Sequence, residues 1–475
     1  AADFGSGTSA NSLKILHGGL RYLQHLDLRR MRASIRARRA YAQACGQLFT
    51  PLPCVMPLGG SGLRSPWVLG PALLANDLIG FDRNRGVAAD QRLPRGRLIS
   101  GQACARAIAP LADMQPLAGA QWWDAVVPDT ARLVLEVVLA AAGAGAVVAN
   151  HLRVERILHA DGRVAGLAFS DLLTGKSGEL RSTRVVNASG PRAAQLARAS
   201  GLSDAALPQA WTGALNVVLR RSLGNAVAVA LTLPRDQAQH DGMLRRGARE
   251  LFFVPWRQRT MVGTAYFPVA SVEEGATPPV DAVGRFMEQA AELAPVAALS
   301  SADVAMAHWG LLPLASPGDS LPRKSPLILD DAAASGVEGL VHVIAEKLTS
   351  APVVSARVLR RIGLAGEDRQ ALRFVPPSSH SSVAGSGEES TSRCEQILHR
   401  AVNEEMAVTL GDLVRRAGLA EAGHPGEEVL ASCADWAVRE AGWDRQDMRL
   451  QVAQVNAWFA QRGALPMAAS AAAVA

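Results

Sequence analysis

Hydrophobic positions along the chain predict helical and extended segments in alternation. After Asp129, apolar residues recur at three- and four-residue spacing, which predicts a helix that Asp129 caps and that ends near Gly143. Short apolar runs bounded by turn dipeptides predict strands, at 146–149, 153–158, 164–170, 179–183 and 185–187. A helix over 192–200 follows the last of these strands.

Prolines and further apolar runs set the remaining predicted elements. An amphipathic, Arg-rich helix is predicted from Leu20 to Cys45, and the three prolines of 48–58 predict a strand at the edge of a sheet. Short helices are predicted at 64–79 and 100–117. A second sheet is predicted over 211–306, with strands at 214–219, 227–233, 250–255 and 260–266, and then a strand at 336–343 and a helix at 352–362.

The last part of the chain is predicted to be a separate helical region. Residues 376–392 are rich in Pro, Ser and Gly, which predicts a mobile linker. Helices are predicted beyond it, at 401–410, 413–416, 427–440 and 445–459. From residue 464 onward the composition predicts a disordered tail.

The composition is that of a globular protein with a sizeable core. The 475 residues are 49% hydrophobic and 19% charged, and the length suggests about three domains. The most apolar stretch, 133–149, is interrupted by Glu136, Gly143 and Gly145, so no membrane-spanning segment is predicted, and we expect no signal peptide. Five widely spaced cysteines without a CxxC pair predict reduced thiols in a cytoplasmic setting and argue against a disulfide framework or a zinc site.

The net charge of +6 is partly local. Six arginines crowd the predicted helix between residues 29 and 39, where a solvated helix face is the main interpretation. The alternative is contact with anionic lipid or nucleic acid. Because no aromatic side chains alternate with these arginines, we expect neither a base-stacking surface nor nucleic-acid binding.

The densest group of residues with ligand-binding chemistry lies in the first two dozen positions. Hydroxyl residues, an amide and Lys14 fill positions 6–14, and His17-Gly18-Gly19 and Arg21 follow directly. Hydroxyls and unpaired backbone N–H groups at a helix start bind phosphate oxygens well. His17 and Arg21 share one face of a helical turn, across the gap that the two glycines leave. An ordinary N-cap and turn is the alternative interpretation of the same pattern.

Residues Gly7–Leu23 (GTSANSLKILHGGLRYL) resemble the signature of FAD-dependent glycerol-3-phosphate dehydrogenases, in the D-amino-acid-oxidase-like flavoprotein superfamily. In that family the Thr/Ser/Lys run lies along the flavin and its pyrophosphate, and the His-Gly-Gly-x-Arg part faces the isoalloxazine ring and the substrate. Asn187–Pro191 resembles the family's strand-to-helix turn beside FAD, and 344–350 corresponds to its turn under the flavin pyrimidine edge. The resemblance implies an α/β fold in which an FAD-binding Rossmann-like domain is interleaved with a β-sheet substrate domain and followed by a C-terminal helical domain.

The domain boundaries expected from this resemblance alternate along the chain. The FAD-binding domain is expected at 1–47, 125–205 and 335–370, and the substrate domain at 48–124 and 206–334. A flexible linker, the helical domain and the disordered tail are expected at 371–392, 393–462 and 463–475.

The resemblance also implies roles for individual residues. His17 is expected to take the hydroxyl proton of the substrate, with Arg21 and Lys347 as further catalytic residues. Substrate binding is expected from Arg21, Tyr22, Arg323 and Lys347. The residues expected to contact FAD are Thr8, Ser9, Asn11, Ser12, Lys14, Leu16, Gly18, Gly19, Arg153, Ala188, Ser189, Gly190, Lys347, Leu348 and Thr349, and no metal is expected.

Several positions depart from the family pattern. Leu312 stands where the family usually has an Arg that grips the substrate phosphate; Arg323 or Lys324 is the candidate replacement, with a solvent-facing loop as the alternative. Ala345 replaces a glycine, and Glu346 is unusual beside an anionic ring, where a buried carboxylate needs a partner. No GxGxxG turn precedes the signature, so we expect a fragment or a sequence without its first βαβ unit.

The expected function is oxidation of a small secondary alcohol with hydride transfer to flavin N5. The family implies sn-glycerol 3-phosphate as the substrate, dihydroxyacetone phosphate as the product and a quinone-type electron acceptor. Another hydroxy acid, a polyol phosphate or an amine is the alternative within this class, and a truncated, non-catalytic flavoprotein that acts as a binding module is the alternative outside it. The expected partners are a small anionic substrate and a quinone or other acceptor, with a homodimer and peripheral contact with the inner face of the membrane as further options for a cytoplasmic protein.

Overall fold

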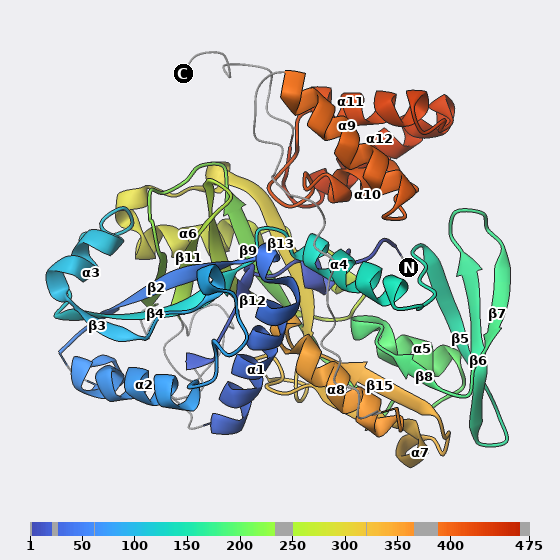
Figure 1. Ribbon diagram of the computed structural model, residues 1–475, viewed down its shortest axis with the longest axis horizontal. Coiled ribbons are helices and arrows are strands. Elements are labelled where there is room, and N and C mark those ends of the chain that lie inside the picture. The colour runs from blue at the N-terminus through green and yellow to red at the C-terminus, as the bar shows by residue number, and fades with distance from the viewer. Residues whose placement is uncertain are drawn as a thin grey trace.

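The computed structural model describes residues 2–20, 27–60, 62–232, 250–319, 321–364 and 388–465 (Figure 1). Arg21 and Tyr22, two of the expected substrate residues, lie outside these ranges, as does most of the predicted linker. Among the helices that are described, none combines the length and apolar character needed to cross a membrane.

A mixed nine-stranded sheet forms the centre of the molecule. Its strands follow the order β1–β4–β2–β10–β11–β12–β9–β13, and β3 pairs with β4. The strands are β1 (Ile15–Leu16), β2 (Thr50–Leu58), β3 (Arg97–Ser100), β4 (Ala118–Val126), β9 (Trp211–Leu219), β10 (Ala228–Thr232), β11 (Glu250–Trp256), β12 (Arg259–Val269) and β13 (Val304–Pro313). Because β1 belongs to the signature segment, this sheet joins the signature to the expected substrate region.

Two smaller sheets complete the β-structure. One joins β14 (Leu327–Asp330), β15 (Leu340–Ile344) and β8 (Val185–Asn187), with β15 parallel to β8. The other is antiparallel and stands at one edge of the molecule (Figure 1); it contains β5 (Leu152–Ala160), β6 (Arg163–Asp171) and β7 (Ser177–Arg181). The parallel pair is the part of the fold that fits a Rossmann-like domain.

Apolar side chains from alternate positions of the large sheet enter two cores, one on each face. On one face they pack against α3 (Gly101–Ile108) and α6 (Ala282–Leu293). On the other face they share a core with α2 (Pro66–Ile79) and the C-terminal helices α9 (Glu388–Asn403), α10 (Leu410–Arg416), α11 (Glu427–Arg439) and α12 (Arg445–Ala460). The remaining helices are α1 (Leu28–Cys45), α4 (Thr130–Gly143), α5 (Ala193–Ala199), α7 (Asp331–Ala334) and α8 (Ala351–Arg361).

This architecture confirms the expected α/β fold with C-terminal helices. The predicted cap of α4 is also confirmed, because the Asp129 carboxylate accepts from the Arg132 N–H over 2.7 Å. The five cysteines are all unpaired, as the sequence predicts.

The expectation that the proline-rich strand lies at a sheet edge is wrong, because β2 lies between β4 and β10. Pro51, Pro53 and Pro57 occupy alternate positions, so their missing N–H groups all face one side of the strand. The pairing with β10 is limited to Cys54 and Val55, whereas the pairing with β4 runs along the whole strand. An inner strand therefore tolerates these prolines because one of its two ladders is short.

Two segments have environments opposite to those predicted. Residues 146–149 form no strand, and the Val147 side chain is fully exposed. No strand in the described part of the chain pairs with this segment, so its apolar residues have no sheet to pack against. Ala464, the first residue of the predicted tail, is buried in the core of the C-terminal helices, and 466–475 lie outside the described residues.

Two predicted helices are shorter than expected. Helix α3 ends at Ile108, two residues before Pro110, whose ring cannot continue a helix. The predicted helix 401–410 is interrupted, because Met406 adopts a left-handed backbone with φ 55° and Thr409 caps the start of α10.

The arginine-rich helix α1 is more than a solvated face. Arg38 is buried and pairs with Asp124, and Arg32 and Arg39 both bind Asp82. Three of the six arginines therefore hold α1 against neighbouring segments, which corrects the sequence interpretation.

Candidate flavin and substrate site

The signature segment begins with a 3-10 turn, Thr8–Ala10, which lies against strand β13. The Thr8 hydroxyl donates to the Leu311 carbonyl oxygen over 3.3 Å. A Cβ atom at Gly310 would lie 2.8 Å from the Thr8 side chain, so glycine lets the turn approach this strand closely. The Asn11 carbonyl oxygen accepts from the Asn216 side chain of β9. The turn is thus fixed on strands of the expected substrate domain.

Lys14, near the end of the polar run, is fully buried. Its Nζ donates to the Ala10 carbonyl oxygen and the Thr130 hydroxyl, and it lies 2.9 Å from Glu421 Oε1. Burial lowers the pKa of Lys14, and the charge of Glu421 opposes that shift. The Lys14 backbone N–H donates to the Ser12 hydroxyl. The ammonium that was expected to contact FAD is therefore enclosed by protein groups, one of which, Glu421, comes from the C-terminal helical domain.

His17 is held by a buried carboxylate and is itself partly exposed. Its side chain is 41% exposed, its Nδ1 lies 3.3 Å from Asp124 Oδ2, and its ring packs edge-to-face on Phe252. Asp124, on β4, also accepts from the Gly18 N–H and the Arg38 guanidinium, over 2.5 and 3.0 Å. Burial disfavours the carboxylate, yet the hydrogen bond and charge of His17, the charge of Arg38 and the Gly18 N–H hold the pKa of Asp124 below its ordinary value. Asp124 thus orients the His17 ring through its contact with Nδ1.

Gly18 serves a contact within the protein. A side chain at this position would collide with the Arg38 guanidinium, which fills the space. The sequence interpretation expected a ligand to approach the backbone at this glycine, but at Gly18 the space is taken by Arg38. Gly19 has φ 95°, a left-handed conformation that favours glycine.

The turn that contains Lys347 packs against helix α1 and shares an apolar cluster with the signature segment. Lys347 Nζ donates to the Ser34 hydroxyl over 2.8 Å, and the Tyr41 hydroxyl donates to the Leu348 carbonyl oxygen over 3.1 Å; Ser34 and Tyr41 both belong to α1. Leu348 packs on the apolar cluster that contains Leu16, and Thr349 is buried. The structure therefore brings the two expected cofactor segments together.

The turn Ala188–Gly190 is braced by a buried polar chain. The Ser189 N–H and hydroxyl donate to Asn187 Oδ1, and Asn187 Nδ2 lies 3.0 Å from His342 Nδ1. The opposite ring nitrogen of His342 lies 3.1 Å from Asp331 Oδ1, and burial lowers the pKa of His342. The 3-10 turn that begins at Gly190 contacts both β13 and β15, so this chain fixes it beside the large sheet.

Arg323 lies close to the position of Leu312. Its backbone N–H donates to the Pro313 carbonyl oxygen over 2.6 Å, and Leu314 pairs with Pro322, so the loop folds back on the end of β13. Arg323 Nε is buried and has no hydrogen-bond partner among the described residues. A buried guanidinium N–H is costly unless a ligand or a water molecule accepts from it.

Other expected residues have different surroundings. Arg153 is 56% exposed on β5, in the sheet at the edge of the molecule (Figure 1), and pairs with Glu155 of the same strand. Lys324 is exposed on its loop. Glu346 is half-buried and accepts from the Ser350 hydroxyl over 3.4 Å, so its carboxylate has a neutral partner.

The signature turn and the turn at 188–190 leave room for a bound group. A Cβ atom at Gly7 or Gly190 would meet no atom within 4 Å. Thr8 and Ser9 are half-buried next to Gly7. These open positions, together with the unpaired donor of Arg323, fit a cofactor with phosphate groups and a small anionic ligand.

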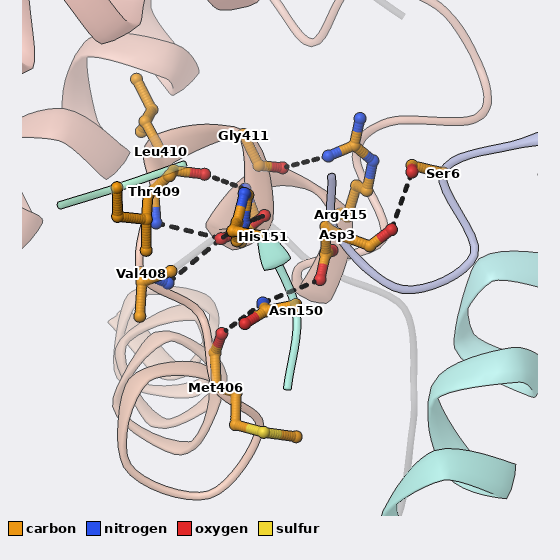
Figure 2. A network of polar contacts seen from close by, with 12 residues as sticks. Asp3, Ser6, Asn150, His151, Met406, Val408, Thr409, Leu410, Gly411 and Arg415 are labelled. Atoms are coloured by element: carbon orange, nitrogen blue, oxygen red, sulfur yellow. Dashed lines mark hydrogen bonds and ion pairs between the residues drawn. The ribbon is translucent and has the colours of Figure 1, made fainter. Parts of the chain in front are cut away.

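A second polar cluster joins the N-terminal segment to the C-terminal domain (Figure 2). Asp3, His151 and Asp412 place one potential metal ligand each within 4.8 Å of one another. However, Arg416 binds both Asp3 oxygens at 2.5 and 2.7 Å, and His151 Nε2 lies 2.9 Å from Asp412. Figure 2 shows Asn150 between Asp3 and the backbone near α10. Because Arg416 already neutralises Asp3, the cluster is an ion-pair network that ties the two regions together.

The family model described as "FAD dependent oxidoreductase" matches residues 1–360. The chain belongs to this family. Glycerol-3-phosphate dehydrogenase from Synechocystis sp. is 25% identical over 376 residues, which cover 76% of this chain and 64% of that protein. The enzyme of the same name from Mycobacterium leprae is 28% identical over 371 residues, which cover 75% and 57%. The chain thus spans less than two thirds of the length of these relatives.

Solved structures show the same fold. Glycerol-3-phosphate dehydrogenase from Bacillus halodurans, in complex with FAD, matches with a TM-score of 0.66 at 16% identity, covering 99% of this chain and 90% of that one. The glycerophosphate oxidase from Mycoplasma pneumoniae, with FAD bound, matches with a TM-score of 0.53 at 14% identity, covering 78% and 89%. These findings confirm the family resemblance of the signature segment and the α/β architecture that it implied.

The sequence interpretation missed Asp124, Arg38 as its partner, and Glu421. Asp124 carries a signal in hindsight, since it is the one charged residue in the strand 118–126. Glu421 carries none, because its contact with Lys14 joins opposite ends of the chain.

Proposed function

We propose that this chain is an FAD-dependent dehydrogenase that oxidises a small anionic secondary alcohol. The first candidate is sn-glycerol 3-phosphate, with dihydroxyacetone phosphate as the product and a quinone-type electron acceptor. The observation that carries the proposal is the partly exposed His17 ring held by the buried Asp124 carboxylate within the signature segment. Family membership and the names of the relatives support the class of reaction.

His17 is suited to accept a proton at Nε2. When Nδ1–H donates to Asp124, Nε2 is the acceptor nitrogen of the neutral ring. It takes the hydroxyl proton of the bound alcohol, and the Asp124 carboxylate stabilises the imidazolium that results. FAD, when bound, supplies the acceptor for the carbon-bound hydride. Thr8, Ser9 and the turn Ala188–Gly190 would hold that cofactor.

Arg323 is proposed to supply the positive charge that Leu312 lacks. Its buried, unpaired Nε–H offers a charge-assisted hydrogen bond to a phosphate or carboxylate of the substrate. Lys347 is proposed to add positive charge at its turn beside α1, with Arg21 as the further expected cation. Because Leu312 changes the family's phosphate contact, another hydroxy acid, a polyol phosphate or an amine is the alternative substrate.

An anaerobic absorption spectrum of the FAD-loaded protein tests this proposal. It is recorded before and after addition of sn-glycerol 3-phosphate, with uncharged glycerol as the control. We expect the flavin bands to bleach with the phosphorylated substrate and to persist with glycerol. Bleaching only by hydroxy acids or amines would move the proposal to the alternative substrates. A protein that takes up no FAD would contradict it and favour the non-catalytic binding module.

The outward face of α2 supports peripheral membrane contact, which we include in the proposal. Trp67, Pro71, Leu74 and Leu78 follow helical spacing and are exposed, and Phe81 lies just beyond the helix. The Trp67 and Phe81 side chains are 84% and 80% exposed. An apolar helix face of this kind suits the interface of a lipid bilayer, where a quinone acceptor is also dissolved.

Sedimentation with vesicles of phosphatidylglycerol and phosphatidylcholine tests this contact. The double variant W67S/F81S should lower the partition coefficient by about tenfold or more, since two aromatic side chains no longer enter the bilayer. L172S, at an exposed position in the turn between β6 and β7, is the control and should sediment like the wild type. Equal sedimentation of W67S/F81S and the wild type would contradict the assignment of α2.

A further inference from the structure

Glu421 reaches three elements of the family region from a segment beyond it. The family model matches residues 1–360, whereas Glu421 follows α10 in the C-terminal helical domain. Its side chain enters the core and is 5% exposed. Oε1 lies 2.9 Å from Lys14 Nζ and accepts from the Ala131 N–H at the start of α4, and the backbone carbonyl oxygen accepts from His308 Nε2 on β13. One residue therefore connects the signature segment, a helix start and a strand.

Lys14 depends on this carboxylate for its charge. Its side chain is fully buried, and its other two partners, the Ala10 carbonyl oxygen and the Thr130 hydroxyl, are neutral. A buried ammonium without a counter-charge is strongly disfavoured. Asp129 lies in the same cluster, but Arg257 binds its carboxylate at 3.2 Å. In the described part of the chain, Glu421 is the carboxylate that forms an ion pair with Lys14.

The backbone around Lys14 needs such an anchor. Lys14 has φ 62°, a left-handed conformation that is unfavourable for a residue with a side chain. Its carbonyl oxygen accepts from the Val127 N–H over 2.7 Å, and its Nζ is bound to the carbonyl oxygen of Ala10, the last residue of the turn Thr8–Ala10. The bond from Lys14 to Ala10 spans the loop that follows Thr8 and Ser9, and the ion pair with Glu421 holds Lys14 in place.

We infer that Glu421 is a positioning residue, through which the C-terminal helical domain fixes the signature segment from Thr8 to Leu16. The inference goes beyond the proposed function, because it gives the C-terminal domain a part in shaping the family site. Its consequence for FAD affinity rests on the proposed contact of FAD with the turn Thr8–Ala10, whereas its consequence for the signature segment does not.

Amide hydrogen exchange of the FAD-free protein tests the inference directly. In E421Q, exchange of residues 8–16 relative to amides of β9 should be about tenfold faster or more, because Lys14 loses its counter-charge. The matched control is E405Q, which removes an equally buried carboxylate of the same domain that binds Arg132 and Arg400. E405Q should leave the ratio within about twofold of the wild type. Equal ratios in the two variants would overturn the inference.

The double variant K14M/E421L separates charge compensation from the loss of a side chain. The double variant leaves no uncompensated charge, but it still lacks the ion pair and the Lys14–Ala10 hydrogen bond, so the exchange ratio should stay about threefold or more above the wild type. It also decides the question if E421Q does not fold, since a wild-type ratio in the double variant would show that the ion pair does not hold the segment and would overturn the inference. FAD dissociation constants provide a separate readout, and E421Q should raise the value by about tenfold while E405Q leaves it within about twofold. Faster exchange with unchanged FAD affinity would support the anchoring and contradict the proposed contact of FAD with the turn Thr8–Ala10.

Discussion

Lys14 and His17 belong to the same short motif, and their side chains have opposite environments. The Lys14 side chain is fully buried and its ammonium is enclosed by three protein partners, whereas the His17 side chain is 41% exposed and is held at one ring nitrogen. A closed ion pair suits anchorage, and a partly exposed imidazole with a free acceptor nitrogen suits proton transfer. One motif therefore supplies an anchored residue and, in the proposed mechanism, the residue that reacts with the ligand.

The largest effect is expected from a change of Asp124, which holds the His17 ring. In D124N, the amide cannot stabilise a His17 imidazolium, so we expect the rate constant of flavin reduction to fall about 10²-fold or more. The buried Arg38 also loses its counter-charge, which should lower the free energy of unfolding by about 3–5 kcal/mol. Single-turnover kinetics and urea unfolding measure the two losses.

Asp77 provides the matched control for this prediction, because it forms a similarly buried ion pair with Arg83 and contacts no imidazole. D77N should lose stability and retain the rate constant of flavin reduction. A D124N protein that reduces its flavin as fast as the wild type would remove Asp124 from the proposed mechanism.

The next largest effect is expected at Arg323, the residue proposed to bind the anionic group of the substrate. R323M removes the buried, unpaired donor, so KM for an anionic substrate should rise about 10- to 100-fold, as expected for one charged hydrogen bond. Its neighbour Lys324 is exposed, and K324M should change KM by less than about twofold. Steady-state kinetics of the three proteins decide between the two residues, and a larger effect of K324M would contradict the assignment.

The smallest effect is expected at Asp82, whose ion pairs with Arg32 and Arg39 are purely structural. Arg32 and Arg39 hold the pKa of Asp82 down to about 2, against a partly opposing effect of burial. Because this folded-state pKa lies below the unfolded value, the stabilisation is complete above about pH 4 and is lost as the pH falls through about 2. D82N should therefore be about 1–2 kcal/mol less stable than the wild type at pH 7, after allowance for solvent screening.

Urea unfolding at pH 7, 4 and 3 measures this difference, which should shrink over the last two values. D90N is the control, since Asp90 is exposed and makes no ion pair among the described residues. A difference between D82N and the wild type that does not change with pH would show that the Asp82 charge is not its source.

Local patterns were enough to predict most elements, and the family resemblance supplied the fold class. Helix α4 with its Asp129 cap and the hairpins β5–β6 and β11–β12 follow from spacing and turn residues that lie within a few positions of each other. The inner place of β2 was not predictable in this way, because it depends on which of its two sides pairs fully. The break at Met406 was also hidden, since apolar spacing continues through a residue with a left-handed backbone.

The candidate site divides in the same manner. His17, the turn at 188–190 and the Lys347 turn were predicted from motifs in three separate segments, and the structure shows Leu16 and Leu348 in one cluster. Asp124 and Glu421 escaped, because each acts on the signature segment through a contact between residues that are distant in sequence. The motifs indicate the residues that are proposed to face a ligand, whereas packing between distant parts of the chain determines which residues hold them.

The division between anchoring and reacting is tested most directly by comparing H17Q and E421Q in one experiment. For each FAD-loaded protein, the rate constant of flavin reduction at saturating substrate and the FAD dissociation constant are measured on the same preparation. H17Q should lose about 10²- to 10⁴-fold in the rate constant and keep its FAD affinity within about threefold. E421Q should lose about tenfold in FAD affinity and less than about tenfold in the rate constant. If both variants lose the same property, or if H17Q reduces its flavin at the wild-type rate, the division is wrong.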